Sequence, residues 1–321
     1  MPKNESLKKI LVLGSGAIKI GEAGEFDYSG SQCLKAIHED GLNSVLINPN
    51  VATIQTDTRF ADQVYLLPVN AEYVESIIEK ERPDGIMLAY GGQTALNCGV
   101  NLDESGVLKK YGVNVLGTQI EGIKKTEDRQ LFKDSMGESG VPVLKSKTVN
   151  NFDDAKKAAE ELVYPVIIRV AYTLGGRGGG VAYNEIELHE IVERGLKASL
   201  VKQVLVEEYI GHWKQIEYEV MQDYDGNNVI VCNMENVLSM KAHTGDNIVV
   251  APSQTIDNHE YHMLRSAALR ATKHVGIVGE CNIQYALAPD SDKYVAIEIN
   301  PRLSRSSALA SKATGYPLAY M

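Results

Sequence analysis

A run of glycines near the middle of the chain has the composition of a phosphate-binding loop. Glycine fills five of the six positions from 175 to 180, and Arg177 is the exception. Each glycine costs conformational entropy on folding, so packing alone does not account for the run. Consecutive backbone N–H groups of such a loop can surround an anion, and the loop can open to exchange a nucleotide. Arg169, at the end of the strand expected before the loop, would add a fixed positive charge beside the phosphates.

Two familiar nucleotide-binding motifs do not fit this chain. The glycine run lacks the Gly-Lys-Ser/Thr ending of a P-loop. The motif that starts at Gly14 has its third glycine two residues too late for a dinucleotide fold, and the second expected strand ends in Asn48 instead of an acidic residue. A flexible linker at 172–180 and a tight strand-to-helix turn at 14–21 are the simpler alternatives.

The last two expected strands carry oxygen donors suited to a metal ion. Glu298 and Asn300 are two residues apart on one strand, so their side chains face the same side. Pairing through the turn at 289–292 would place Gln284 of the preceding strand roughly opposite Glu298. One carboxylate and two amide oxygens suit Mg²⁺ that bridges nucleotide phosphates, and an ordinary polar sheet face is the alternative. Arg302, just past the strand, would stabilise the charge of a phosphoryl group in transfer.

Three further residues are weaker candidates when each is taken alone. His243 lies in an expected turn, Glu208 closes a strand where it could meet a ribose, and Arg129 lies on a helix face. A structural role is commoner for a single histidine, and solvent exposure is commoner for a single Glu or Arg. These three gain weight only beside the motifs above.

Composition narrows the class of protein. The 321 residues are 44% hydrophobic and 23% charged, which is typical of globular domains, and the net charge of −10 argues against sequence-independent binding of nucleic acid. The four cysteines form no C-x-x-C pair, so we expect neither a zinc site nor disulfides. The polar start and the lack of a run of about 18 apolar residues predict a soluble, cytoplasmic protein without a membrane partner.

The first 120 residues alternate short apolar runs with amphipathic stretches, which predicts a parallel sheet covered by helices. The expected strands are 9–13, 44–47, 85–89 and 114–116, and the expected helices are 27–40, 71–81 and 93–100. Turns at 14–16, 48–50 and 91–92 follow three of the strands. Ligands of open α/β sheets lie beyond the carboxyl ends of the strands, so a site is expected at these turns.

The rest of the chain divides into a small α/β unit, which resembles a lid, and a set of longer strands. One helix at 124–136 is expected to open the small unit, followed by strands 143–147, 166–170 and 204–207 and helices 153–162 and 185–199. A hairpin of 215–222 and 228–236, a helix at 259–274, and strands 280–287 and 294–300 come next. An Ala-rich helix without a C-terminal capping signal is expected at the end, which suggests a truncated protein or a split gene.

With these residues in place, the chain resembles the amino-terminal, carboxyphosphate-forming half of carbamoyl-phosphate synthetase large subunits. The resemblance runs over essentially the whole chain and is carried by the segments 24–30 (GEFDYSG), 91–97 (GGQTALN), 126–129 (TEDR), 217–220 (EYEV), 233–236 (NMEN), 243–246 (HTGD) and 302–317 (RLSRSSALASKATGYP). The last segment is the longest and the most specific of these.

The resemblance implies an α/β fold in three parts. These are a pre-ATP-grasp, Rossmann-like domain at 1–127, an ATP-grasp lid subdomain with the glycine-rich loop at 128–211, and an ATP-grasp catalytic subdomain at 212–321 that is truncated at its C-terminal end.

The resemblance also implies the site residues. The nucleotide would be bound by Arg129, Arg169, Gly175, Gly176, Glu208, Ile210, Gln215, Lys241, Ala242 and His243, together with Gln284 and Glu298. A site for two magnesium ions would consist of Gln284, Glu298 and Asn300. The catalytic residues would be Asn300, His243 and Arg302, with Arg302 acting at the transition state.

Enzymes of this family are ligases that use ATP with Mg²⁺ or Mn²⁺. Bicarbonate attacks the γ-phosphate to give carboxyphosphate, and ammonia from a glutaminase small subunit then displaces phosphate to leave carbamate. A C-terminal synthetase half phosphorylates carbamate for arginine or pyrimidine biosynthesis. The residues suit this chemistry, because a poor nucleophile needs positioning and charge neutralisation, and a labile product needs a closing lid. Oligomer formation stays open.

Some positions depart from the family pattern. Gln215, Leu238 and Lys241 all fall around the expected adenine edge and monovalent-cation site, so only weak activation by K⁺ is expected. Two alternatives to the synthetase half remain. One is another ATP-grasp carboxylate ligase such as a biotin carboxylase, and the other is a fragment or paralogue that binds ATP without turnover.

Overall fold

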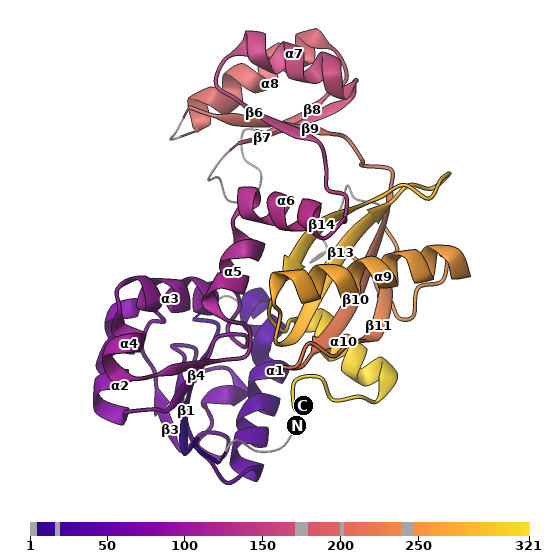
Figure 1. Cartoon of the computed structure of the whole chain (residues 1–321). Helices are drawn as coiled ribbons and strands as arrows, with labels where there is room; N and C mark the ends of the chain where they lie inside the picture. The colour runs from indigo at the N-terminus through magenta and orange to yellow at the C-terminus, as the bar shows by residue number, and fades with distance from the viewer. Residues whose placement is uncertain (1–4, 17–19, 171–178, 200–201, 239–246) are drawn as a thin grey trace.

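The computed structural model describes residues 5–16, 20–170, 179–199, 202–238 and 247–321. Three separate sheets organise this part of the chain (Figure 1). None of the described helices combines the length and the apolar character needed to span a membrane. The four cysteines are buried and form no disulfide.

The first sheet is parallel, as the alternating pattern predicted, with the strand order β3-β2-β1-β4-β5. Its strands are β1 (Lys9–Leu13), β2 (Asn43–Ile47), β3 (Gln63–Tyr65), β4 (Gly85–Met87) and β5 (Asn114–Leu116). The helical segments are α1 (Ile20–Glu39), η1 (Ile54–Thr56), α2 (Ala71–Glu81), α3 (Gly92–Glu104) and α4 (Val107–Tyr111).

Strand β1 is apolar on both faces, because both faces of the sheet are covered by helices. Leu11 and Leu13 pack in one cluster with residues of α2 and α3, whereas Ile10 and Val12 pack in another with residues of α1. Helix α2 has the predicted bounds, and the Asn70 side chain caps it by accepting a hydrogen bond from the Tyr73 amide.

The single helix expected at 124–136 is wrong, because the chain forms two helices there. Helix α5 (Ile120–Glu127) ends at Asp128, whose extended backbone (φ −82°, ψ 125°) starts the new helix α6 (Arg129–Glu138). The Asp128 carboxylate accepts hydrogen bonds from the amides of Gln130 and Leu131, at 2.8 and 2.9 Å. This capping pairs amide donors that the start of a helix leaves unpaired. It favours a new helix at Asp128 over the continuous helix that the composition predicted.

The second sheet is antiparallel, with the order β6-β9-β7-β8, and it lies with its two helices at the top of Figure 1. Its strands are β6 (Ser146–Val149), β7 (Val166–Val170), β8 (Gly180–Ala182) and β9 (Val204–Glu208). The two helices are α7 (Phe152–Leu162) and α8 (Glu185–Ala198). The strand expected at 143–147 starts later than predicted, since Val143 forms only an isolated bridge to Ala296 of another sheet. Helices α7 and α8 share one apolar cluster with the sheet.

The third sheet is also antiparallel and has the order β12-β11-β10-β13-β14. Its strands are β10 (Lys214–Gln222), β11 (Asn228–Asn236), β12 (Val249–Val250), β13 (Gly279–Leu287) and β14 (Tyr294–Asn300). Helix α9 (Asn258–Val275) covers the face that carries Ile216, Tyr218 and Ile283. The opposite face carries acidic and amide side chains, because successive residues of a strand point to opposite sides.

Helix α10 (Arg305–Thr314) lies on this second face and contacts β10, β11 and α1. The prediction that the final helix lacks a C-terminal cap is wrong. The helix ends at Gly315, which has the left-handed conformation (φ 75°) and donates its amide to the Ser311 carbonyl. Glycine takes this conformation without the steric cost that a Cβ atom would add.

The turn between β4 and α3 approaches the end of β1 so closely that it requires glycine. A Cβ atom on Gly91 would lie 2.2 Å from the carbonyl oxygen of Gly14 and 2.5 Å from that of Leu13. Both obstacles are backbone atoms, so relief would require the two turns to separate.

We expect Gly91→Ala to lower the free energy of unfolding by about 1–3 kcal/mol, the usual cost of forcing atoms into a packed region. The matched control is Gly137→Ala in α6, where a Cβ atom would meet nothing within 4 Å. That change should leave stability equal or slightly higher, because alanine favours a helix. Urea unfolding of both variants measures the difference, and equal midpoints would contradict the close approach.

Candidate functional site

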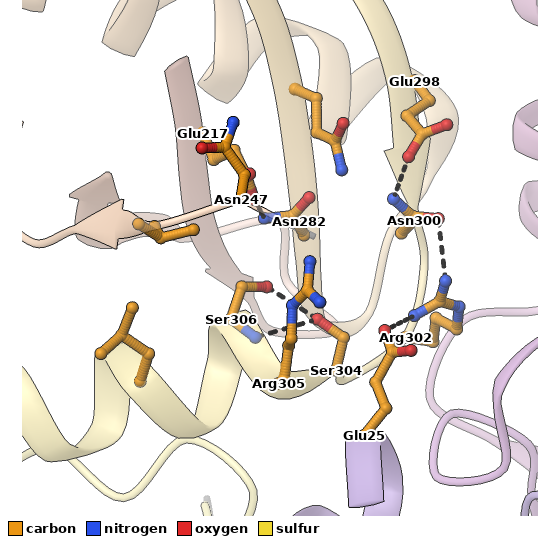
Figure 2. A pocket seen from close by; sticks show the side chains of 13 residues that line it. Glu25, Glu217, Asn247, Asn282, Glu298, Asn300, Arg302, Ser304, Arg305 and Ser306 are labelled. Atoms are coloured by element: carbon orange, nitrogen blue, oxygen red, sulfur yellow. Dashed lines mark hydrogen bonds and ion pairs between the residues drawn. The ribbon is translucent and has the colours of Figure 1, made fainter. Parts of the chain in front are cut away.

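A polar pocket of about 460 Å³ lies between the second face of the third sheet and the start of α10 (Figure 2). Strands β13 and β14 contribute Asn282, Gln284, Glu298 and Asn300. The segment that joins β14 to α10 and the first turn of that helix contribute Arg302, Ser304, Arg305 and Ser306. Glu217 comes from β10, and Glu25 comes from α1, which packs against the first sheet and against α10. The pocket therefore combines one sheet with residues of α1 and α10 that lie far apart in the sequence.

The three oxygen-donor residues lie together in this pocket. The strand register pairs Gln284 with Glu298, and Asn300 pairs with Asn282. The Asn300 amide nitrogen donates to Glu298 Oε1 at 2.9 Å, which leaves the second carboxylate oxygen of Glu298 available on an exposed surface. Their assignment as metal ligands stays a prediction. The structure brings together in one pocket the oxygen donors that such a site requires.

Arg302 is a cation whose hydrogen-bonding capacity is only partly used. Its Nη2 donates to Asn300 Oδ1 at 3.3 Å, and its Nη1 lies 4.0 Å from Glu25 Oε1. The guanidinium packs over the Phe26 ring at 5.4 Å, and the side chain is 15% exposed. Its Nε and Nη1 are buried without a hydrogen-bond partner in the described part of the chain. Buried unsatisfied donors are costly, so this guanidinium is poised to bind an anion.

Several residues that line the pocket were not singled out as site residues from the sequence, and Glu217 and Asn282 are the two with the most extensive hydrogen bonds among them. Glu217 accepts hydrogen bonds from Asn236 at 2.6 Å and from the Asn282 amide nitrogen at 3.0 Å. Burial raises the pKa of Glu217, and neighbouring Glu219 adds to the rise, whereas the hydrogen bonds from Asn236 and Asn282 oppose it. The available signal was the alternation of acidic or amide residues with apolar ones along both strands, which indicates one polar face.

Four of the nucleotide candidates, in the region from α6 to the loop after β9, do not line this pocket. Arg129 is exposed at the start of α6, and Arg169 on β7 pairs with Glu207 at 2.9 Å. Glu208 is half-buried at the end of β9, and Ile210 is buried against Trp213.

Of the remaining candidates for nucleotide binding, one lies in the described part of the chain and five lie outside it. Gln215 is buried at the start of β10, and its Oε1 has no partner among the described residues. The residues Gly175, Gly176, Lys241, Ala242 and His243 lie outside the described residues.

Two family models match the chain. The model described as "Carbamoyl phosphate synthase preATP-grasp domain" matches residues 6–125, and the model described as "Carbamoyl-phosphate synthase L chain, ATP binding domain" matches residues 128–321. The boundary between the two matches falls at Asp128, where α5 ends and α6 begins.

Curated relatives agree with these matches. The chain is 58% identical over 314 residues to the mitochondrial arginine-specific carbamoyl phosphate synthase large chain of Neurospora crassa. That alignment covers 98% of this chain and 27% of the relative, so the chain spans about a quarter of that protein. It is also 56% identical over 315 residues to the "Carbamoyl phosphate synthase large chain, N-terminal section" of Methanopyrus kandleri, covering 98% of this chain and 56% of the relative.

Solved structures define the fold. A biotin carboxylase from Campylobacter jejuni, in a complex named as containing β-γ-ATP, superposes with a TM-score of 0.78 at 21% identity. The superposition covers 98% of this chain and 70% of that one. The ATP-grasp arrangement expected from the sequence is confirmed at the level of fold.

Proposed function

Because the chain belongs to the carbamoyl phosphate synthase large-chain family, as both family models and the curated relatives establish, we propose that it phosphorylates bicarbonate with ATP. The product is carboxyphosphate, which reacts with ammonia to give carbamate. The chain acts as the N-terminal synthetase half of a longer or split large chain. It is accordingly a ligase of the ATP-grasp type.

One observation carries the proposal, namely that the guanidinium of Arg302 lies beside a set of oxygen donors with part of its hydrogen-bonding capacity unused. Nε and Nη1 of Arg302 have no hydrogen-bond partner among the described residues, and Glu298 and Asn300 lie in the same pocket. A phosphoryl group in transfer carries negative charge on its equatorial oxygens. Preorganised donors that face such charge lower the barrier, because no solvent has to reorganise during the reaction.

The donor set also fits a magnesium ion. Gln284, Glu298 and Asn300 offer two amide oxygens and one carboxylate, which are the hard oxygen ligands that Mg²⁺ and Mn²⁺ prefer. When bound, the ion would neutralise negative charge on the nucleotide phosphates. Gln215 and the departures at 238 and 241 support at most weak activation by K⁺.

The pocket suits bicarbonate as well as the phosphoryl group. Arg302 and Arg305 both line it, and Arg305 opens helix α10, whose N-terminus adds a partial positive charge. Holding a weak nucleophile in line with the phosphoryl group replaces a bimolecular encounter with a positioned one. The volume of about 460 Å³ accommodates a small anion beside phosphate groups.

The nucleotide-binding set belongs to the same proposal. The residues proposed to contact ATP are Arg129, Arg169, Gly175, Gly176, Glu208, Ile210, Gln215, Lys241, Ala242 and His243, with His243 also catalytic. They lie on the proposed lid at 128–211 and on the proposed catalytic subdomain at 212–321, with the pre-ATP-grasp domain at 1–127. The proposed partners are a glutaminase small subunit that supplies ammonia and a C-terminal synthetase half that uses carbamate.

The test is release of ADP by the purified chain with MgATP. We expect hydrolysis that requires bicarbonate, increases with ammonia and does not require biotin. A requirement for biotin would assign the chain to the biotin carboxylase type of activity. Binding of MgATP in calorimetry without bicarbonate-stimulated hydrolysis would identify a non-catalytic ATP-binding chain.

A further inference from the structure

Two carboxyl groups lie side by side directly behind the pocket, and neither lines it. Glu219 on β10 is fully buried, and Glu280 on β13 is 5% exposed. Both belong to the polar face of the third sheet, since Glu219 pairs with Asn282 and Glu280 with Met221 in the strand register. The hydroxyl of Ser307, on α10, lies 3.3 Å from Glu219 Oε2 and 3.2 Å from Glu280 Oε1.

Hydrogen-bond donors are too few for two ionised carboxylates at this place. The Asn282 amide nitrogen donates to Glu219 Oε1 at 2.9 Å. Ser307 has one hydroxyl hydrogen and two carboxyl groups within reach. Oε2 of Glu280 is buried without any partner in the part of the chain that the structure describes. A proton on that oxygen would turn an unsatisfied acceptor into a donor.

The surrounding charges do not neutralise the pair. The titratable groups that face the pair are Arg302 from the segment after β14, Tyr90 from the turn after β4, Cys281 on β13 and Cys232 on β11. Arg302 acts to lower the pKa of Glu280, whereas burial raises the pKa of the tyrosine and of both thiols, and the carboxyl groups add to that rise. Arg302 is thus the cation that opposes the raised pKa of Glu280, and Arg305 acts on Glu217. Burial raises the pKa of Glu280 well above its usual range, and Glu219 raises it further, against smaller opposing effects of Ser307 and Arg302.

The geometry points to a shared proton: Glu280 is a neutral carboxylic acid that donates its proton to Glu219, and Glu219 in turn orients the pocket amide of Asn282. Both amide hydrogens of Asn282 are then committed to carboxylates, one on Glu217 at 3.0 Å and one on Glu219 at 2.9 Å. This fixes which end of the amide can face a pocket ligand. Glu280 is thus a positioning residue. Of the tests below, only the measurement of enzymatic rate rests on the proposed function.

The protonation state is tested directly by infrared spectroscopy of the 321-residue chain. A buried carboxylic acid gives a carbonyl band that shifts in D₂O, and we expect this band at neutral pH. Glu280→Gln keeps the shape and an N–H donor toward Glu219, and it should remove the band. The control is Glu207→Gln, since Glu207 is also buried but is paired with Arg169. A band that persists in Glu280→Gln overturns the assignment.

Stability against pH gives a second, independent readout. A raised folded-state pKa means that the folded chain keeps a proton that the unfolded chain releases. Proton binding by Glu280 therefore stabilises the folded chain. This contribution is fully present below the pKa of an unfolded glutamate, about 4.3, and is lost as pH rises toward the pKa of Glu280 in the folded chain. Relative to Glu280→Gln, the unfolding equilibrium constant of the parent chain should therefore rise about tenfold per pH unit in that window. A difference that does not vary with pH would overturn the shared proton.

The catalytic readout separates positioning from simple packing. We expect Glu280→Ala to lower kcat for bicarbonate-dependent hydrolysis about tenfold or more with little change in the KM for ATP, because the orientation of Asn282 is lost. Ionisation of Glu280 at alkaline pH should lower the kcat of the parent chain. Glu280→Gln should recover most of the loss seen in Glu280→Ala and should lack that alkaline decline. An equal loss in both variants would contradict the role. If the parent chain shows no bicarbonate-dependent hydrolysis, the proposed function fails. The infrared carbonyl band and the pH dependence of unfolding still test whether Glu280 carries the proton.

Discussion

Replacing Arg302 by alanine is expected to lower the rate of bicarbonate-dependent ATP hydrolysis by about 10³-fold. The guanidinium is largely buried at the pocket, and two of its nitrogen donors have no hydrogen-bond partner among the described residues, so they are available to an anion there. Removing it deletes an interaction that is strongest when charge develops on the transferred group. Steady-state release of ADP with saturating MgATP measures the effect, which should fall mainly on kcat.

Two further substitutions make the Arg302 result specific. Arg302→Lys keeps the charge but loses the planar, multi-donor geometry, so it should recover only part of the rate. Arg59→Ala removes an arginine whose side chain is 80% exposed and pairs with Asp57 in the first sheet's domain, and it should leave the rate unchanged. An Arg302→Ala chain with nearly parental kcat would show that this pocket is not where phosphoryl transfer occurs.

Glu298→Gln is expected to lower the same rate by about 10²-fold at fixed Mg²⁺. The substitution keeps the size of the side chain and removes the one carboxylate among the three proposed ligands. The affinity for the ion should fall, because an amide oxygen is a weaker ligand than a charged one. Titration of the rate with Mg²⁺ should therefore show a higher half-saturating concentration and partial recovery at high Mg²⁺.

The control for this prediction is Glu121→Gln on α5. Glu121 is 81% exposed and forms only a surface ion pair with Lys125, so its loss should change neither the rate nor the Mg²⁺ titration. Glu298→Gln with an unaltered Mg²⁺ dependence would mean that the ion, if required, is held elsewhere.

Much of the local structure followed from the sequence. The bounds of β1, α2, β5, β7, β11 and β14 agree with the predicted ranges. Helix α2 was readable because its apolar positions recur at helical spacing after a capping Asn70. Gln284 and Glu298 were paired correctly because a short turn joins their strands, and a turn fixes the register of a hairpin.

Other features depend on contacts between distant segments. The break at Asp128 arises from a side chain that caps its own backbone, in a stretch whose composition favours a continuous helix. A site was expected at the ends of the parallel strands as well as on the final hairpin. The polar pocket lies at the hairpin and combines the third sheet, α10 and Glu25 of α1. No pattern of spacing within a few residues indicates that Glu25 lies near Arg302.

The sequence by itself determined the type of each long element, the polar or apolar character of its faces and the pairing of the final hairpin. These properties depend on side chains that are neighbours along the chain, so their periodicity records them. Only the tertiary structure decided that Glu217, Glu219 and Glu280 share one buried face beneath α10. That outcome depends on the register between strands about 60 residues apart, which is set by the burial of the whole sheet and not by any local segment.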